Sequence, residues 1–221
     1  SITINRYLNL MAESGVTHCF MEVSSHGIHQ KRTSGLHFTG GVFTNLTHDH
    51  LDYHETFAAY RDVKKIFFDQ LPKSAFALVN IDDKNGAVML QNTAAKQFTY
   101  ALKTVADYKA KILENQFNGL LLTINNNEVW SKLIGTFNAY NLLAIFATAD
   151  ILGMEPLENL RLLSVLESVS GRFQHFISES GITAIVDYAH TPDALKNVLG
   201  TINTIRTHNE QVITVVGCGG D

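Results

Sequence analysis

Four short segments of the chain carry side chains that could take part in chemistry. The first is MEVSSHGIHQKR, in which Glu22 interrupts an apolar run and polar donors follow. A carboxylate inside an apolar strand costs several kcal/mol unless it is paired or bound to a metal ion. Ser24, Gln30 and Arg32 supply hydroxyl, amide and guanidinium donors that suit a phosphate or a sugar. An edge strand that faces water, followed by an ordinary polar loop, would explain the same residues without a ligand.

The second segment is a cluster of three histidines and two aspartates within seven positions, HDHLDYH. The run from His48 to His54 approaches the HxHxDH pattern of zinc hydrolases. In that pattern the last aspartate and histidine are adjacent, whereas here Tyr53 separates Asp52 from His54, which disfavours a zinc site. A zinc site in this cluster would use His48, His50, Asp52 and His54.

The helix predicted after this cluster has an aromatic stripe that contains a lysine. The stripe, at helical spacing, comprises Phe57, Tyr60, Lys64, Phe67 and Leu71. An ammonium held among aromatic side chains tends to lose its proton, and the neutral amine is the form that reacts with carbon dioxide. The alternative is that Lys64 extends along the helix so that its charged end reaches water.

The third and fourth segments place polar groups beside helix starts. In GTFNAYNLLAI, Asn138 and Asn141 lie three positions apart on one helix face, so their amides could meet the edge of a base. Both would also serve as ordinary capping residues. In VDYAHTPDAL, Asp187 and His190 come at a strand end beside a helix N-terminus. That position favours ligand contact, although a capping turn would look similar.

Apolar runs that alternate with helical patterns predict the elements that carry these segments. The alternation is typical of an α/β protein with a mostly parallel central sheet flanked by helices. Residues 97–134 differ, because β-prone runs broken by asparagine and glycine predict a small antiparallel β region. A second βαβ rhythm follows residue 171, and we expect it to begin a second, Rossmann-like α/β domain, with the domain boundary near residue 177.

Helical spacing and apolar runs set the bounds of the other elements. Thr191 followed by Pro192 marks the start of the last helix, since threonine caps a helix and proline suits its first position. The predicted helices cover residues 3–14, 56–71, 83–92, 138–152, 156–167 and 192–206, and the predicted strands outside the antiparallel region cover residues 17–23, 41–46, 75–80, 175–180, 182–188 and 212–216.

Length and composition limit the class of protein. With 221 residues and 45% hydrophobic content, the chain can bury the core of one large domain, or of one domain and part of another. A net charge of -4 shows no basic excess, so neither nucleic acid nor a membrane surface is expected as a partner. No apolar run reaches the roughly 20 residues of a membrane span. The only cysteines, Cys19 and Cys218, are far apart, which favours a reducing cytoplasm over a disulfide framework.

Four motifs occur in the chain in the order in which they occur in one family. EVSSHG, TNLTHDHLDYH with a lysine on the next helix, GxFNxxN, and GRF followed by DYAHTPDAL together resemble the Mur ligases. The ordered set covers nearly the whole chain, which makes it far more specific than any one motif. EVSSHG and DYAHTPDAL are most similar to the Mur ligases that add the third peptide residue to UDP-N-acetylmuramoyl-L-alanyl-D-glutamate in peptidoglycan synthesis.

The resemblance implies roles for nine residues. Three would bind magnesium and act in catalysis, three would bind the UDP-muramoyl dipeptide, and three would bind ATP, which is a substrate. The magnesium set is Glu22, His50 and Lys64, the last as a carbamate; the dipeptide set is Ser24, Gln30 and Arg32; the ATP set is Asn141 for adenine, Arg172 for the phosphates and Asp187 for the ribose. In the family, ATP phosphorylates the substrate carboxylate, and the amine of the incoming amino acid attacks the acyl phosphate.

The resemblance also predicts how the chain is organised. Residues 1–176 would form the central, ATPase-type domain, and residues 177–221 would begin the C-terminal domain. The phosphate-binding GxxxxGK[ST] loop, which precedes this segment in the family, does not occur in the chain. We therefore expect a piece of a longer, cytoplasmic and monomeric ligase that is inactive alone and binds ATP negligibly.

Two other functions remain open from the sequence. One is a zinc-dependent hydrolase that uses the HDHLDYH cluster, and the other is a non-catalytic binding domain of Mur-ligase shape. Within the ligase class, the added amino acid could be diaminopimelate or lysine, because the chain carries no selecting motif.

Overall fold

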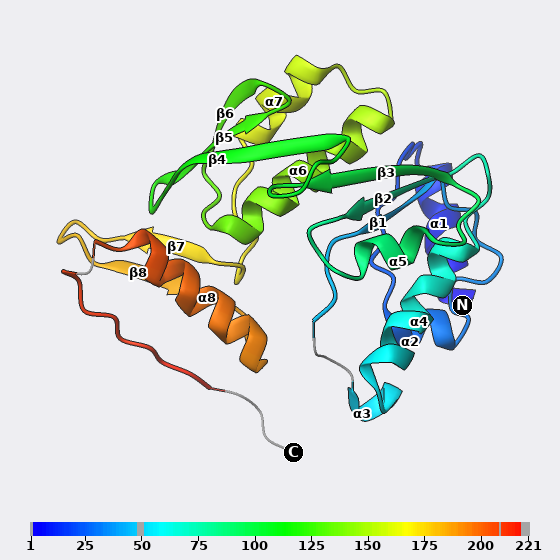
Figure 1. The fold of residues 1–221 in the computed structure, drawn as a ribbon, viewed down its shortest axis with the longest axis horizontal. Helices are drawn as coiled ribbons and strands as arrows, with labels where there is room; N and C mark the ends of the chain where they lie inside the picture. The colour runs from blue at the N-terminus through cyan, green and yellow to red at the C-terminus, as the bar shows by residue number, and fades with distance from the viewer. Residues whose placement is uncertain (1, 48–50, 208, 218–221) are drawn as a thin grey trace. The chain divides into compact units, whose positions relative to one another are not determined.

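The computed structural model describes residues 2–47, 51–207 and 209–217 (Figure 1). The chain divides into two compact units, which are described here one at a time. The first unit contains residues 1–41, 50–77 and 87–97, and the second contains residues 42–49, 78–86 and 98–221. Among the described helices, none is long and apolar enough to cross a membrane.

A six-stranded, mostly parallel sheet is the central element of this α/β fold, as predicted. Its strands lie in sequence order. The strand FALVN has no exposed position, which explains why its first four residues are apolar without interruption. Strand β3 pairs with the start of β4 in parallel, whereas the pairs β4–β5 and β5–β6 are antiparallel. The strands are β1 (Gly40–Phe43), β2 (Phe76–Asn80), β3 (Lys96–Ala101), β4 (Tyr108–Gln116), β5 (Gly119–Ile124) and β6 (Asn127–Ser131).

The antiparallel strands β4, β5 and β6 confirm most of the prediction made for residues 97–134, whereas β3, which contains Phe98, pairs in parallel and was wrongly assigned to that region. Asn125 and Asn126 form the turn between β5 and β6, with φ of +46° and +68°. Asparagine tolerates this left-handed conformation better than most residues, and two such residues in succession suit the twist of a hairpin.

Short helices gather around α4 in the first unit. Both α2 and α3 pack against α4. Thr56 caps α4, because its side chain accepts a hydrogen bond from the Ala59 N–H at 3.1 Å. The described helices of this unit are α1 (Ile2–Glu13), α2 (Ser25–His29), α3 (Leu51–His54), α4 (Phe57–Asp69) and, apart from Gly86, α5 (Gly86–Leu90).

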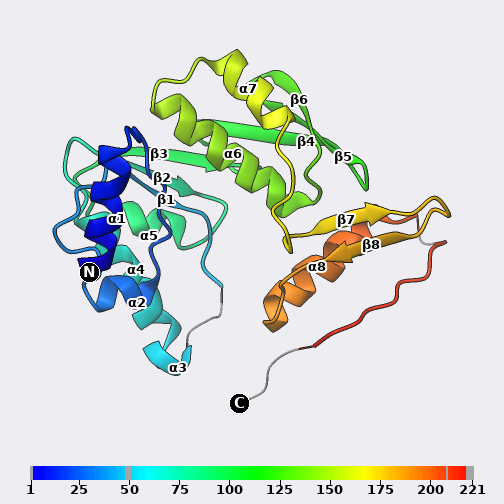
Figure 2. The ribbon, with the colours of Figure 1, turned by 180° about the vertical axis from the view of Figure 1, so that it is seen from behind.

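In the second unit, two helices cover the antiparallel strands (Figure 2). α6 (Thr136–Ile151) packs against β4, β5 and α7, and α7 (Pro156–Ser164) packs against β6. The shared core is aliphatic and aromatic. Its fully buried members include Leu120, Leu122, Ile124, Leu142, Leu143 and Leu163.

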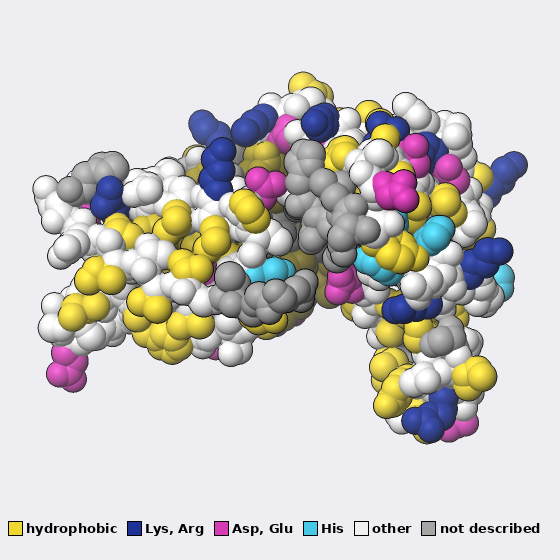
Figure 3. Space-filling model, turned by 90° about the horizontal axis from the view of Figure 1, so that it is seen from below, with side chains coloured by type: hydrophobic (Ala, Val, Ile, Leu, Met, Phe, Trp, Pro, Cys, Tyr) yellow, Lys and Arg dark blue, Asp and Glu magenta, His cyan; other side chains and the backbone are white. Residues whose placement is uncertain are grey.

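The last part of the second unit contains a short antiparallel pair and a helix. Strand β7 (Gln174–Ile177) pairs with β8 (Thr183–Val186), and α8 (Pro192–Ile205) follows. Thr191 caps α8 through a hydrogen bond from the Ala194 N–H at 3.3 Å, as its sequence predicted. Hydrophobic side chains lie exposed over this part of the chain (Figure 3).

Two predicted strands are wrong. Residues 17–23 and 212–216 are not strands in the described structure. A strand needs a neighbour that satisfies its backbone groups and an apolar surface that covers its side chains. Neither segment has such cover, since Phe20 is 78% and Val215 is 94% exposed. Helix α1, which was correctly predicted, likewise has no buried residue.

Candidate functional site

The donors predicted for the UDP-muramoyl substrate lie around α2. Ser24 caps this helix, because its Oγ accepts a hydrogen bond from the Gly27 N–H at 3.1 Å. Gln30 ends the helix, and its Oε1 accepts two hydrogen bonds from the Arg32 guanidinium, at 3.0 Å from Nε and 2.6 Å from Nη2. Gln30 and Arg32 are therefore held together on the exposed surface, where a single ligand could contact both side chains.

The residues predicted to bind magnesium are less fully described. Glu22 is exposed in a segment without regular secondary structure, so the predicted apolar strand does not bury its carboxylate. His48 and His50 lie outside the described residues. Within the described part of the chain, no group of three or more histidine, cysteine, aspartate or glutamate side chains is arranged to hold a metal ion.

A polar contact that the sequence analysis missed joins α2, α3 and α4. His54 Nε2 and Ser25 Oγ lie 2.8 Å apart in a buried hydrogen bond, and the His54 ring stacks on Tyr60 with centroids 5.3 Å apart. His29 Nδ1 makes a further hydrogen bond, at 2.8 Å, with the hydroxyl of Tyr53. The last histidine of HDHLDYH therefore has a structural partner in α2. The sequence offered only a weak signal of it, a histidine beside a helix with an aromatic face.

Lys64 lies half-buried on α4, and its Nζ is 5.6 Å from the centroid of the Tyr60 ring. At this distance the ring face attracts a cation. Tyr60 thus connects Lys64 with His54, which stacks on the same ring. The aromatic environment predicted for Lys64 is present, and its ammonium form has a favourable neighbour here.

The adjacent lysine is the more buried one. Lys65 is 8% exposed and forms an ion pair with Asp69 one turn further along α4. The buried face of α4 contains Tyr60, Lys65 and Phe68. The predicted stripe had Lys64 and Phe67 instead of Lys65 and Phe68, so the buried face is rotated slightly around the helix axis. Helical spacing cannot decide between neighbouring positions at the edge of a face, which is why Lys65 was missed.

Lys65→Ala is expected to lower the free energy of unfolding by about 1 to 3 kcal/mol, because it leaves Asp69 without its cation and removes a packed aliphatic stem. The matched control is Lys132→Ala, which removes a lysine from an exposed ion pair with Glu167. That change should cost about 1 kcal/mol or less. Denaturant unfolding of both variants measures the difference, and equal losses would contradict the structural role of Lys65.

The asparagines predicted to contact adenine lie in the first turns of α6. Gly135 caps this helix with φ of +93° and has no side chain to accept a hydrogen bond. A Cβ at this position would lie 2.8 Å from Thr201 and 2.9 Å from Phe137, so a glycine is required. Asn138 Nδ2 donates to the Ile134 carbonyl at 2.8 Å, and Asn141 Nδ2 donates to Asn138 Oδ1 at 3.2 Å.

Arg172 lies just before β7 and Asp187 lies just after β8, and a hydrogen bond between these two segments brings them together. Asp187 Oδ2 accepts a hydrogen bond from the Phe173 N–H, and its Oδ1 accepts one from the Ala189 N–H, both at 2.7 Å. The Arg172 guanidinium lies 5.8 Å from the centroid of the Tyr188 ring. Phe173 has φ of +46°, a strained conformation that the hydrogen bond to Asp187 stabilises. Asp187 therefore shapes the backbone that presents Arg172.

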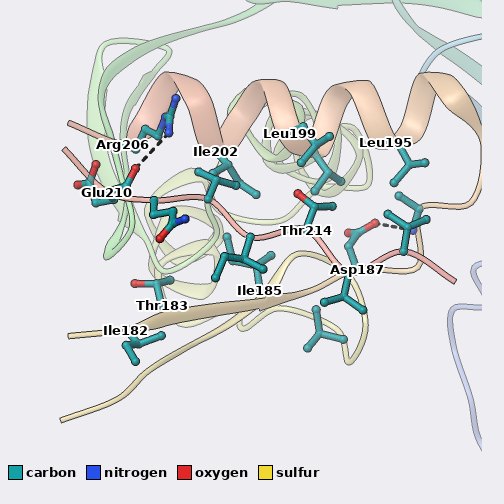
Figure 4. Close-up of a pocket in the computed structure, with 18 of the residues that line it drawn as sticks. Ile182, Thr183, Ile185, Asp187, Leu195, Leu199, Ile202, Arg206, Glu210 and Thr214 are labelled. Atoms are coloured by element: carbon teal, nitrogen blue, oxygen red, sulfur yellow. Dashed lines mark hydrogen bonds between the residues drawn. The ribbon is translucent and has the colours of Figure 1, made fainter. Parts of the chain in front are cut away.

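A cavity of about 650 Å³ lies between β8, α8 and residues 210–217 (Figure 4). Asp187 is the one predicted site residue among those that line it. Figure 4 shows Ile185 and Leu199 facing the cavity from the strand and the helix. Because aliphatic side chains form much of its wall, the cavity resembles the space between the layers of an α/β domain more than a phosphate site.

The predicted site residues that the structure describes are divided between the two units. The first unit contains Glu22, Ser24, Gln30, Arg32 and Lys64, and the second contains Asn141 on α6 and the pair Arg172 and Asp187. The boundary near residue 177 stays a prediction.

The family of the chain follows from comparison with known proteins. Residues 1–149 match the Mur ligase middle domain, and residues 171–221 match the glutamate ligase domain of Mur ligases. The chain belongs to the Mur ligase family.

Within that family, several curated relatives that match the whole chain share one name. The chain is 57% identical over 220 residues to the UDP-N-acetylmuramoyl-L-alanyl-D-glutamate–2,6-diaminopimelate ligase of Phocaeicola vulgatus, and 55% identical over 221 residues to that of Cytophaga hutchinsonii. All of this chain is covered, but only 46% and 45% of those relatives. The chain thus spans about half the length of the curated relatives it matches.

Solved structures agree with this assignment. A structure of a UDP-N-acetylmuramoyl-L-alanyl-D-glutamate–2,6-diaminopimelate ligase superposes with a TM-score of 0.77 at 33% identity, over 92% of this chain and 43% of the other. UDP-N-acetylmuramate-alanine ligase from Thermotoga maritima superposes with a TM-score of 0.60 at 25% identity, over 75% and 38% of the two chains.

Proposed function

We propose that the full-length protein is an ATP-dependent ligase that adds diaminopimelate to UDP-N-acetylmuramoyl-L-alanyl-D-glutamate in peptidoglycan synthesis. The observation that carries the proposal is 55–57% identity along the whole chain to relatives named for this reaction. The names of these relatives also favour diaminopimelate over lysine, a choice that the motifs left open. A cytoplasmic location and a monomeric state belong to the same proposal.

The proposed reaction has two steps. A carboxylate oxygen of the dipeptide attacks the γ-phosphorus of ATP, which forms an acyl phosphate and releases ADP. The amine of diaminopimelate then attacks the acyl carbon, so that the amide forms and inorganic phosphate leaves. Positioning and electrostatic stabilisation account for most of the catalysis in such phosphoryl transfers.

The residues proposed to hold magnesium fit the chemistry of that ion. Mg²⁺ prefers oxygen ligands, and the exposed carboxylate of Glu22 is available to it. Lys64 would join this set only as a carbamate, which replaces an ammonium with two oxygens. When bound, magnesium would neutralise charge on the phosphoryl oxygens. His50 is proposed as a further ligand.

The dipeptide and ATP would be held by the polar groups described above. Gln30 and Arg32 offer paired amide and guanidinium groups to an anionic or sugar portion of the UDP-muramoyl dipeptide, and Ser24 lies at the start of the same helix. On the second unit, Arg172 is suited to the ATP phosphates because its guanidinium is exposed. Asp187 is proposed for the ribose and Asn141 for the adenine.

Incubation of the full-length protein with ATP, magnesium and the UDP-muramoyl dipeptide tests this function. Mass spectrometry should detect one amide product with meso-diaminopimelate and at most a trace with L-lysine. Efficient product formation with lysine would refute the proposed specificity, and no product with either amino acid would refute the ligase activity.

Arg32→Ala in the full-length ligase is expected to raise KM for the UDP-muramoyl dipeptide by about 10- to 150-fold. This factor corresponds to the binding free energy lost with a hydrogen bond to a charged group. The melting temperature should hardly change, since Arg32 is exposed and its partner Gln30 is on the surface. Arg161→Ala is the matched control, because Arg161 also makes two hydrogen bonds to a surface partner, Glu158, on α7. If the two variants have the same KM, Arg32 does not bind the substrate.

A further inference from the structure

Asp82, which follows β2, clamps the loop between β3 and β4 to α6. Its Oδ2 accepts hydrogen bonds from the N–H groups of Leu102 and Lys103, both at 2.8 Å. Its Oδ1 accepts one from the Thr104 N–H at 2.8 Å. The same Oδ2 also accepts a hydrogen bond from the Tyr140 hydroxyl at 2.9 Å. One carboxylate therefore joins two segments that lie far apart in the sequence.

The charge state of this contact is well defined. Partial burial by itself raises the pKa of Asp82, but hydrogen bonds from Thr104, Lys103 and Tyr140 outweigh it and hold the pKa far below its usual range. Burial, together with the hydrogen bond to Asp82, raises the pKa of Tyr140. An ionised acceptor and a neutral donor thus face each other at any pH at which the protein is folded and working.

The residues beside Asp82 hold the loop that follows β1. Asp83 Oδ2 accepts a hydrogen bond from the Leu46 N–H at 2.9 Å, and Asn80 Nδ2 donates one to the Thr44 carbonyl at 2.9 Å. The turn itself is tight, because a Cβ at Gly86 would lie 2.1 Å from the Asn80 carbonyl oxygen. Residues 80–86 therefore connect α6 on one side with the loop after β1 on the other, all within the second unit.

We propose that Tyr140 is a positioning residue for ATP, whose hydrogen bond to Asp82 fixes the first turns of α6 and, with them, Asn141. The inference rests on the proposed function, in which Asn141 meets the adenine. Tyr140 immediately precedes Asn141, so a shift of the helix at Tyr140 displaces the Asn141 side-chain amide that would contact the adenine. The capping glycine of α6 has no side chain to hold this end of the helix. The Tyr140 hydroxyl makes one of the side-chain hydrogen bonds that do so, beside those of Asn138 to the Ile134 carbonyl and of the Gly135 N–H to Asn115.

Tyr140→Phe in the full-length protein tests the proposal, since it removes one hydroxyl and keeps the ring. Asp82→Asn is the less useful variant, because three backbone N–H groups would lose an ionised acceptor and the protein could fail to fold. The dissociation constant for ATP with magnesium is measured by isothermal titration, and KM and kcat are measured in the ligase assay.

Tyr108→Phe is the matched control. Tyr108 also donates a hydrogen bond to an aspartate, Asp150, at 2.7 Å, but this contact lies at the opposite end of α6 from Asn141. Burial and the Asp150 carboxylate raise the pKa of Tyr108 just as burial and Asp82 raise that of Tyr140. The two variants therefore remove the same kind of bond from the two ends of one helix.

Tyr140→Phe should raise the dissociation constant and KM for ATP by about tenfold while kcat changes less than about twofold, and Tyr108→Phe should leave all three within about twofold. Equal ATP constants for the two variants would overturn the proposal. A wild-type protein that binds ATP but forms no amide would instead refute the proposed function, and the ratio of dissociation constants would still decide the role of Tyr140.

Discussion

Lys64→Ala in the full-length ligase is expected to lower kcat by about a thousandfold or more, the scale of losing a group that stabilises transition-state charge. The reason is the proposed carbamate, which would bring negative oxygens to the cation that serves the phosphoryl transfer. Lys64 is half-buried on α4, and its Nζ lies 5.6 Å from the centroid of the Tyr60 ring. Turnover is measured with saturating substrates, so that a change in binding does not enter the result.

Two controls separate the carbamate from a general role of the lysine. Short carboxylates such as acetate should restore part of the turnover of Lys64→Ala, since they can supply oxygens in place of the carbamate. Lys65→Ala should show the opposite pattern, with reduced stability but kcat close to that of wild type per folded molecule. Near wild-type turnover of Lys64→Ala would rule out the carbamate.

Glu22→Gln is expected to produce the second large effect, a fall in kcat/KM of about 100-fold at limiting magnesium. The amide keeps the size of the side chain but removes the charge that a divalent cation requires. Higher magnesium concentrations should restore part of the activity, because weaker binding is overcome by mass action.

Glu13→Gln serves as its control. Glu13 is also an exposed glutamate of the first unit, and its carboxylate accepts a hydrogen bond from Asn9 on α1. This variant should match the wild type at every magnesium concentration. An unchanged magnesium dependence of Glu22→Gln would show that Glu22 does not bind the ion.

Local patterns predicted most of the elements. The apolar run that contains FALVN indicated a strand, and the structure shows that every position of this strand is buried. Thr191 with Pro192 marked the start of α8 correctly. The segment at 17–23 also contains an apolar run, yet it is not a strand, because a strand is stabilised by its neighbours. An apolar run therefore indicates what a segment can form, but not whether a partner lies beside it.

The motifs named candidate site residues, whereas the contacts of those residues came only from the structure. The motifs indicated Arg172 and Asp187, but the hydrogen bond from Phe173 to Asp187, which joins them, depends on a left-handed residue that no pattern revealed. Long-range polar bonds were also invisible. The bond between Tyr140 and Asp82 spans 58 positions, and periodicity within one helix carries no information about such a partner.

Transfer of labelled oxygen tests the central claim most directly. The dipeptide is prepared with heavy oxygen in the carboxylate that reacts, and the full-length protein is supplied with ATP, magnesium and diaminopimelate. The proposed acyl phosphate requires that one labelled oxygen leave with inorganic phosphate for each amide formed, since that oxygen bridges carbon and phosphorus before the amine attacks. Labelled phosphate in step with the amide product is the predicted result. Amide formation with unlabelled phosphate, or ATP hydrolysis without amide, would contradict the account.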